Sequence, residues 1–342
     1  MTSASPVTFN VIFVRHTVGL LRVFLHSLRT RTTTARFRLV SNGCTRAEAR
    51  ILREFCRDHE RFAFLELSPA TVLPHQQALN ELLARERSPY FAFMDSDCYV
   101  TGDPFTDVVT TLDGSAALFS GEPTWRAHMS PRLPRGYVRL SDQYRQAHDG
   151  RCVGSSYLAV YDRHALVACM EETGVSFWQY HWEQLPAPVQ SELTHAGLRL
   201  LWYDNCKVVN ILLGLRGHLC TYAELPQLWH IGAVSVSVTS RARRRLIQGL
   251  QALGALQPLR DAFQRVGLRA APSPDFGNEE QDAALACQSL QLAVSDHFVR
   301  LLRSLEAAAP VPTRFEHPDE AVVSAVGVIE GHLRQLHQEW SS

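Results

Sequence analysis

Two aspartates one residue apart follow an apolar run in the segment 91–100, which reads FAFMDSDCYV. Asp95 and Asp97 could form a solvated turn, where aspartate is common because its side chain bonds to nearby backbone. They could also form a clamp whose oxygens surround one hard divalent cation. A cation bound in this way takes phosphate oxygens as further ligands and neutralises a diphosphate leaving group. The elements around the pair must decide between the two interpretations.

Strand and helix patterns alternate before this pair. The apolar runs 7–14, 37–40, 62–67 and 90–94 predict strands, and the segments 18–28, 45–59 and 74–87 predict helices. Thr45 and Glu48 have the spacing of a capping box. This order predicts an α/β fold with a mostly parallel sheet and helices on both faces. Ligands of such sheets bind at the carboxyl ends of the strands, where Asp95 and Asp97 fall.

The second half of the chain changes character. Residues 116–120, 153–161 and 198–203 predict strands, 188–195 a helix, and 122–150, rich in Pro, Arg and Gly, a long loop. From about residue 239, apolar residues recur at three- and four-residue spacing. We therefore expect two regions: a catalytic domain at 1–238 and a C-terminal α-helical region at 239–342 with a partly separate core. The helical region could form a homodimer interface, recognise an acceptor, or pack over the sheet.

Composition excludes several classes of protein. Lys+Arg and Asp+Glu number 34 each, so no basic surplus points to nucleic acid. The eight cysteines form no C-x-x-C pair, which fits a reducing cytoplasm better than a disulfide scaffold. Neither a signal peptide nor a run of the roughly 18 apolar residues of a membrane span is visible. The partner must be inferred from the site.

The chain resembles the nucleotide-sugar-binding half of GT-A fold glycosyltransferases, especially the family 2-like group, over about residues 7–235. The resemblance is carried by a second strand ending in SNG, a helix with QQALNELL, and the apolar strand followed by D-S-D (Asp95, Ser96, Asp97). It implies a metal-dependent transfer from a nucleotide sugar, a UDP-sugar above all. It assigns Asp95 to the sugar nucleotide and the metal, and Asp97 to Mn²⁺ or Mg²⁺.

The resemblance also implies binding residues elsewhere. The base of the nucleotide would lie against the ends of the first two strands, and the downstream GSS strand would line the same site: Val14, Arg15, His16, Asn42, Gly43, Gly154 and Ser155. His230 in LWHIGAVS falls where such enzymes place a C-terminal metal ligand, and neutral imidazole suits Mn²⁺ better than Mg²⁺. The alternative for each is an ordinary structural role. The helix entry PHQQALN, with His75, Gln76 and Asn80, departs from the family pattern.

An inverting transfer needs a carboxylate base for the proton of the acceptor. Members of the family usually have an acidic E-D pair here, whereas this chain has Glu183 and Gln184 at a shifted spacing. Glu183 is the predicted base, with Asp149, Glu192 and Asp204 as rivals, and a retaining mechanism needs no such base. The nearby aromatic residues could stack on a sugar or an apolar acceptor, or could simply pack in the core: Phe177, Trp178, Tyr180 and Trp182.

The predicted function is thus a hexosyltransferase acting on an acceptor of open identity, such as a glycan, a peptide or a secondary metabolite. One alternative is a non-catalytic nucleotide- or glycan-binding module on the same scaffold. A haloacid dehalogenase-type phosphatase also uses D-x-D after a strand. Its motif, however, belongs to an early strand and has Thr or Val where this chain has Tyr99.

Overall fold

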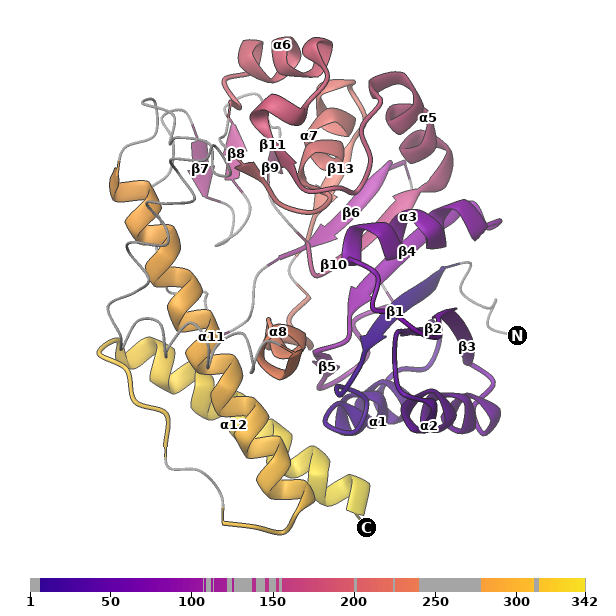
Figure 1. The fold of residues 1–342 in the computed structure, drawn as a ribbon, viewed down its shortest axis with the longest axis vertical. Helices are drawn as coiled ribbons and strands as arrows, with labels where there is room; N and C mark the ends of the chain where they lie inside the picture. The colour runs from indigo at the N-terminus through magenta and orange to yellow at the C-terminus, as the bar shows by residue number, and fades with distance from the viewer. Residues whose placement is uncertain are drawn as a thin grey trace.

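A seven-stranded sheet forms the centre of the protein in a computed structural model, in the order β13-β6-β10-β4-β1-β2-β3 (Figure 1). The structure describes residues 7–106, 108, 112, 114–121, 125, 137–139, 145–147, 152–153, 156–199, 202–223, 225–239, 278–310 and 314–341. The strands of the sheet are β1 (Thr8–Val14), β2 (Arg36–Asn42), β3 (Phe62–Ser68), β4 (Tyr90–Asp95), β6 (Ala117–Ser120), β10 (Leu158–Asp162) and β13 (Cys220–Tyr222). Strand β10 runs antiparallel to β4 and β6, and the other pairs are parallel.

Helices cover both faces of this sheet. On one face lie α1 (Arg22–Arg31) and α2 (Arg46–Arg57), and on the other α3 (His75–Arg85), α5 (Arg163–Thr173), α6 (Ala187–His195) and α7 (Lys207–Leu215). Thr45 caps α2 in the predicted capping box, since its hydroxyl accepts from the Glu48 amide and the Glu48 carboxylate accepts from its backbone N–H. The mostly parallel sheet with helices on both faces and a helical C-terminal region is confirmed.

Three predicted elements differ from the observed ones. Helix α1 begins at Arg22 because the chain first turns at Thr17, whose hydroxyl and amide both bond to the Val14 carbonyl. The predicted strand 153–161 is divided: Cys152–Val153 (β9) forms a separate small sheet with Tyr137–Arg139 (β7) and Arg145–Ala147 (β8), two strands that lie inside the predicted loop 122–150. The predicted strand 198–203 is reduced to Trp202–Tyr203 (β12), paired with Tyr180–His181 (β11). Residues 200 and 201 lie outside the described part.

A short antiparallel ladder lies beside the main sheet. It joins β5 (Cys98–Val100), directly after the two aspartates, to β14 (Leu228–His230), and α8 (Val234–Thr239) follows β14. A 3₁₀ helix, η2 (Trp182–Gln184), precedes α6. The ladder therefore brings the end of the predicted catalytic domain back to the D-S-D segment.

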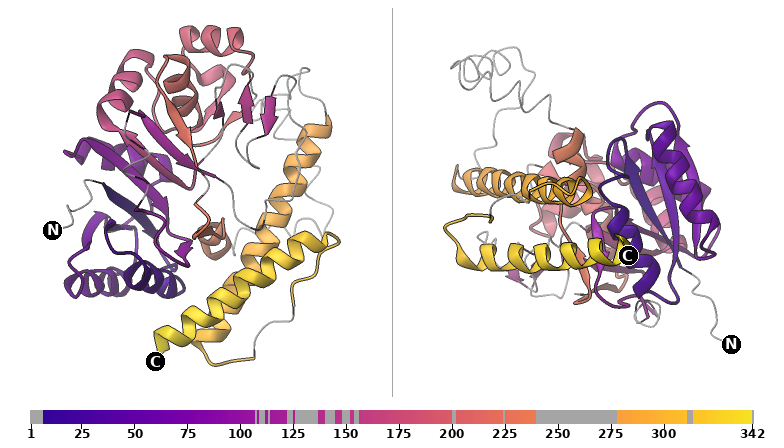
Figure 2. Two further views of the ribbon diagram at one scale, coloured as in Figure 1. Left: turned by 180° about the vertical axis from the view of Figure 1, so that it is seen from behind. Right: turned by 90° about the horizontal axis from the view of Figure 1, so that it is seen from below.

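Two long C-terminal helices, α11 (Asn278–Glu306) and α12 (Glu320–Ser341), lie side by side along the domain (Figure 2). Helix α11 packs on α8, and α12 packs on α1. One hydrophobic core runs through both regions, from Phe24 and Tyr99 to Phe298 and Leu333. Within the described residues, none of the helices has the length and hydrophobicity to cross a membrane. The boundary at 238/239 stays a prediction, and the core is continuous across it.

Candidate metal centre at the end of strand β4

The D-S-D segment lies where the order of the strands reverses. Strands β2 and β3 lie on one side of β1, whereas β4 lies on its other side, with Asp95 beside Ile12. The ends of β1 and β4 therefore border the crevice in which α/β sheets bind ligands. Val14 ends β1, Arg15 and His16 follow it, and Asp95 ends β4.

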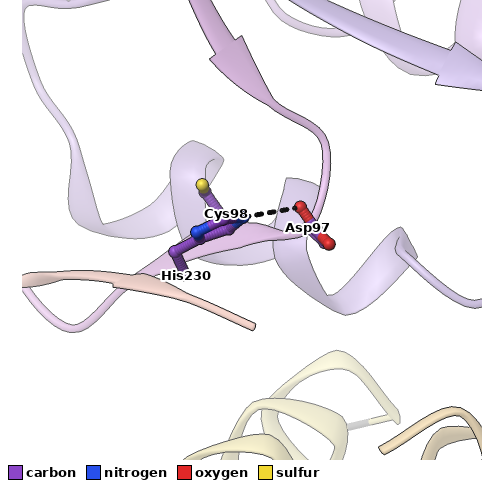
Figure 3. Close-up of side chains that lie close together, drawn as sticks. All are labelled: Asp97, Cys98 and His230. Carbon is purple, nitrogen blue, oxygen red and sulfur yellow. Dashed lines mark ion pairs between the residues drawn. The ribbon is translucent and has the colours of Figure 1, made fainter. Parts of the chain in front are cut away.

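The ladder between β5 and β14 brings Asp97 and His230 together. His230 is the register partner of Cys98, next to Asp97. Its Nε2 lies 3.3 Å from Asp97 Oδ1 and 3.5 Å from Asp95 Oδ2. Figure 3 shows the Asp97 and His230 side chains facing one another beside Cys98. The structure thus unites the three predicted metal ligands, which come from two distant segments.

Two hydrogen bonds from backbone amides hold Asp97 in place. Its Oδ2 accepts a hydrogen bond from the Val234 amide at 3.0 Å, and its carbonyl accepts one from Ile231 at 3.2 Å. The intervening turn is left-handed, with φ of 81° at Gly232 and 58° at Ala233. Since an alanine in this region is strained, the turn depends on these contacts. Asp97 therefore orders the loop that follows His230.

Burial and neighbouring charges have opposite effects on the pKa values of His230 and Asp97. Burial by itself would lower the pKa of His230, but the Asp97 and Asp95 carboxylates outweigh it and raise that pKa to about 9. Burial would likewise raise the pKa of Asp97, but the His230 charge and the hydrogen bond from the Val234 amide lower it overall. Without a metal, a protonated imidazole thus lies between two carboxylates, and a metal cation would replace that positive charge.

The donor atoms fit a divalent cation. Two ligands at right angles, each about 2.1–2.3 Å from a cation, lie roughly 3.0–3.3 Å apart. The Nε2–Oδ1 separation of 3.3 Å is of this size. Two carboxylates with one imidazole form a ligand set suited to Mn²⁺. The Asp95 side chain is 32% exposed, against 8% for Asp97, so it faces the open side of the site.

Cys98 is a further potential ligand that the sequence analysis did not single out. Its sulfur could join Asp97 and His230, since one ligand atom from each lies within 4.8 Å of the others. Burial, with the nearby Asp97 and Asp95 charges, raises the pKa of the thiol. The thiol is therefore protonated at neutral pH, and a metal would have to displace the proton. The only sequence signal was the position of Cys98 directly after the motif.

Arg15 and Gly43 connect the loops at the ends of β1, β2 and β3. The Arg15 guanidinium donates to the carbonyls of Gly43 and Ala70, both at 3.1 Å. Gly43 has a φ of +69°, and a Cβ there would lie 2.6 Å from the Val72 amide nitrogen. Only glycine fits this position, because the loop from β3 passes directly over it.

Asn42 and His16 flank this region in different ways. The Asn42 side chain is buried and forms two hydrogen bonds of 2.9 Å with the Leu73 backbone, so it holds the loop before α3. His16 is exposed and adopts a φ of 70°. Val14 and Ser96 are half-buried. Binding of a nucleotide by these residues stays a prediction.

The candidate bases lie in different surroundings. Glu183 is exposed on η2, and Glu192 bonds to Arg216 at 3.0 Å. Asp204 is half-buried just before α7, where its Oδ1 accepts from Gln179 and from the Asn205 amide. Asp149, Gly154 and Ser155 lie outside the described residues.

Helix α3 and the loop after α5 meet near these candidates. Asn80 bonds to Ser176 and to the Phe177 amide, both at 3.4 Å. His75 packs its ring edge-on to Phe93, and Gln76 is half-buried. These contacts place Asn80 in the scaffold of the loop 176–179, which carries the exposed Trp178.

Comparisons with known proteins give structural likenesses at low identity. A scan of protein-family models returned no match, and neither did a search of curated protein sequences. Among solved structures, TarS of S. aureus (residues 1–349) is 13% identical, with a TM-score of 0.39, 96% of this chain and 92% of that chain covered. The mannosyltransferase PcManGT from Pyrobaculum calidifontis, in complex with GDP-Man and Mn²⁺, is 13% identical, with a TM-score of 0.40, 98% of this chain and 85% of that chain covered.

Mouse xyloside xylosyltransferase 1 is 10% identical, with a TM-score of 0.37, and the alignment covers 64% of this chain and 86% of that chain. All three TM-scores are below 0.5, so these likenesses do not establish a common function.

Proposed function

We propose that this chain is a metal-dependent glycosyltransferase of the GT-A type that uses a nucleotide-sugar donor. The observation that carries the proposal is the group Asp95, Asp97 and His230 at the carboxyl end of β4, where the strand order reverses. A buried carboxylate–imidazole group at such a place is suited to a cation that in turn binds a diphosphate.

The donor would lie across the ends of β1 and β4. Its diphosphate would bind on the side of Asp97 and His230, with the more exposed Asp95 toward the ribose and sugar. Its base would lie toward Val14 and the Arg15–Gly43 contact, which orders the neighbouring loops. We favour a UDP-sugar, as the resemblance of the motifs implies.

Cleavage of the sugar–diphosphate bond leaves negative charge on the diphosphate. A bound Mn²⁺ or Mg²⁺ would supply the positive charge that stabilises this leaving group. Asp97 and His230 would hold the cation, and His230 favours Mn²⁺. The residues of the chain thus position the donor, and a carboxylate of the chain must accept the proton of the acceptor if the anomeric configuration is inverted.

For that base we favour Asp204 over the predicted Glu183. It comes two residues before Cys206, whose buried thiol has its pKa raised by burial and by the charges of Asp204 and Asp95. Cys206 therefore lies within electrostatic reach of both carboxylates. It also has a φ of 65°, and such strain is common at functional sites. Asn210 lies one helical turn after Cys206 and donates to the Ser156 hydroxyl. The next residue, Tyr157, accepts a hydrogen bond from the Asp95 amide through its carbonyl. These contacts connect the start of α7 to the end of β4.

Thermal unfolding with nucleotide sugars tests the proposal. We expect Mn²⁺ together with one of UDP-, GDP- or dTDP-sugars to raise the Tm, because ligands that bind only the folded state stabilise it. EDTA and Asp97→Ala should each abolish the shift and the slow release of nucleotide diphosphate from the donor. No metal-dependent shift with any donor would refute the proposal. A shift without release or transfer would instead indicate a non-catalytic binding module.

A further inference from the structure

The ladder that carries Cys98 and His230 has a second face. Tyr99 and Trp229 are register partners, one residue away from the Cys98–His230 pair on each strand. Because side chains alternate along a strand, these two rings point away from the metal ligands. They stack with centroids 6.2 Å apart and planes 13° from parallel, and Tyr99 is fully buried.

His332 on α12 contacts both of these rings. Its Nδ1 shares a hydrogen bond of 3.0 Å with the Tyr99 hydroxyl, and its ring contacts Trp229 edge-on at 4.7 Å. Burial and the Arg31 charge lower the pKa of His332, so the ring is neutral at physiological pH. A side chain of the C-terminal helix thus contacts both strands of the ladder.

A second connection ties α12 to the same strand. Arg31 of α1 donates to both carboxylate oxygens of Glu339 at 2.9 Å and to the Val100 carbonyl at 3.2 Å. The Arg31 side chain is 19% exposed, and its Nη2 donates to both Glu339 oxygens, so the bond is charge-assisted and stronger than one between neutral groups. Helix α12 therefore contacts the ladder through His332 and the end of β5 through Arg31.

We propose that α12 positions the metal ligands and that His332 is a positioning residue of the centre. The inference rests on the proposed function, since it presupposes a cation at Asp97 and His230. A two-stranded ladder with three residue pairs is marginally stable by itself and needs a packed face. His332 supplies that packing at Tyr99 and Trp229, and so fixes the separation of Asp97 and His230.

Mn²⁺ binding by the full-length protein, measured by calorimetry without any nucleotide, tests this role. His332→Ala should weaken the Mn²⁺ affinity by roughly tenfold, the lower range for loss of a residue that supports metal ligands. His332→Asn can restore a polar group near the Nδ1 position and should recover most of the affinity. Tyr99→Phe, which removes only the hydroxyl, should cause a smaller loss.

Glu330→Gln on the same helix is the matched control. Glu330 bonds to His297 of α11 at 2.6 Å, so the substitution removes the charge from a contact of α12 with α11 and does not touch the ladder. We expect this variant to bind Mn²⁺ as tightly as the wild type. Circular dichroism of each variant establishes that the protein measured is folded, and Tyr99→Phe keeps the test valid if His332→Ala does not fold.

The outcomes separate the two proposals. If the wild-type protein binds Mn²⁺, and His332→Ala and Tyr99→Phe bind it with the same affinity, the positioning role is wrong and the proposed function stands. Equal weakening by Glu330→Gln and His332→Ala would also overturn it, because the effect would then be one of general stability. If the wild-type protein binds no Mn²⁺ in the absence of nucleotide, there is no preformed centre for His332 to position and this inference fails, whereas the proposed function is decided separately by the Tm shift with metal and nucleotide sugar.

Discussion

At the scale of single residues, the two oxygens of the Asp97 carboxylate have different roles, one at the candidate metal site and one in the backbone structure. Oδ1 faces His230 at 3.3 Å, while Oδ2 accepts the Val234 amide at 3.0 Å. One oxygen is thus oriented toward the metal position and the other holds the loop after β14. Both oxygens thus have a partner that offsets the unfavourable desolvation of a buried carboxylate.

A comparison of two carboxamide variants tests the choice of base. Asp204→Asn should lower the turnover of the nucleotide-sugar donor by about 10²–10⁴, the usual contribution of a general base, with little change in Mn²⁺ affinity. Glu183→Gln should leave turnover nearly unchanged, because Glu183 is exposed on η2. Steady-state release of nucleotide diphosphate measures both. The reverse order of effects would favour Glu183 as the base.

Two glycine substitutions separate backbone strain from collision. Gly43→Ala combines a φ of +69° with a Cβ only 2.6 Å from the Val72 nitrogen, whereas Gly114 has a φ of +80° and open space around its Cβ position. Gly114→Ala should therefore cost only the strain, about 1 kcal/mol. Gly43→Ala should cost more, about 3 kcal/mol, and weaken donor binding. Urea unfolding measures the two losses of stability, and donor-induced Tm shifts measure the loss of binding. Equal losses of stability in the two variants would show that the Cβ at position 43 does not clash with the Val72 backbone.

At the level of elements, a buried acid joins the middle of β2 to the end of α3. Glu86 accepts hydrogen bonds from the Arg87 and Ser88 amides at 2.9 Å and from Arg38 of β2 at 3.0 Å. Arg38 also donates to Asn10 of β1 at 3.1 Å, and Asn10 donates to the Ala92 carbonyl of β4 at 2.8 Å. This network connects the neighbouring strands β2, β1 and β4, the last of which ends at the candidate site.

The same acid predicts a pH dependence of stability. Burial would raise the pKa of Glu86, but the Ser88 amide, Arg38 and the Arg87 amide outweigh it and lower the pKa below 4.5. A lowered pKa stabilises the folded state above the unfolded-state value, and this stability disappears as the pH falls through the folded-state pKa. Glu86→Gln should therefore be less stable than the wild type at pH 7, by about 1–3 kcal/mol.

The difference between Glu86→Gln and the wild type should shrink as the pH falls below about 4.5, near the ordinary carboxyl pKa. Urea unfolding across this range measures it. Glu54→Gln is the control, because Glu54 is 51% exposed and its arginine pairs lie on the surface. Exposed pairs contribute at most about 1 kcal/mol. A pH-independent difference for Glu86→Gln would contradict the assignment.

At the scale of the whole molecule, the C-terminal helices share the core of the sheet domain. Leu333 on α12 and Leu25 on α1 belong to one buried cluster. The chain should therefore unfold in one main transition by calorimetry, and Leu333→Ala and Leu25→Ala should both shift it. Each should cost about 2–5 kcal/mol, the range for removing buried leucine atoms. Two separate transitions, with Leu333→Ala affecting only one, would show an independent helical region.

Local patterns in the sequence were sufficient to predict the repeated strand–helix units, the capping box at Thr45 and the D-S-D pair at the end of a buried strand. These features depend on residues close together in the chain, because periodicity and capping act within a few residues. His230 was singled out through resemblance to a family. The predicted base Glu183 followed from motif spacing, and it stays a prediction.

Only the tertiary structure decided which distant residues meet. The order of the strands sets Asp95 beside the end of β1, and the β5–β14 ladder sets His230 against Asp97 on one face and Tyr99 against Trp229 on the other. The packing of α12 then adds His332 to that second face. No local pattern contains these contacts, because strand pairing and helix packing depend on the burial of apolar surface over the whole chain.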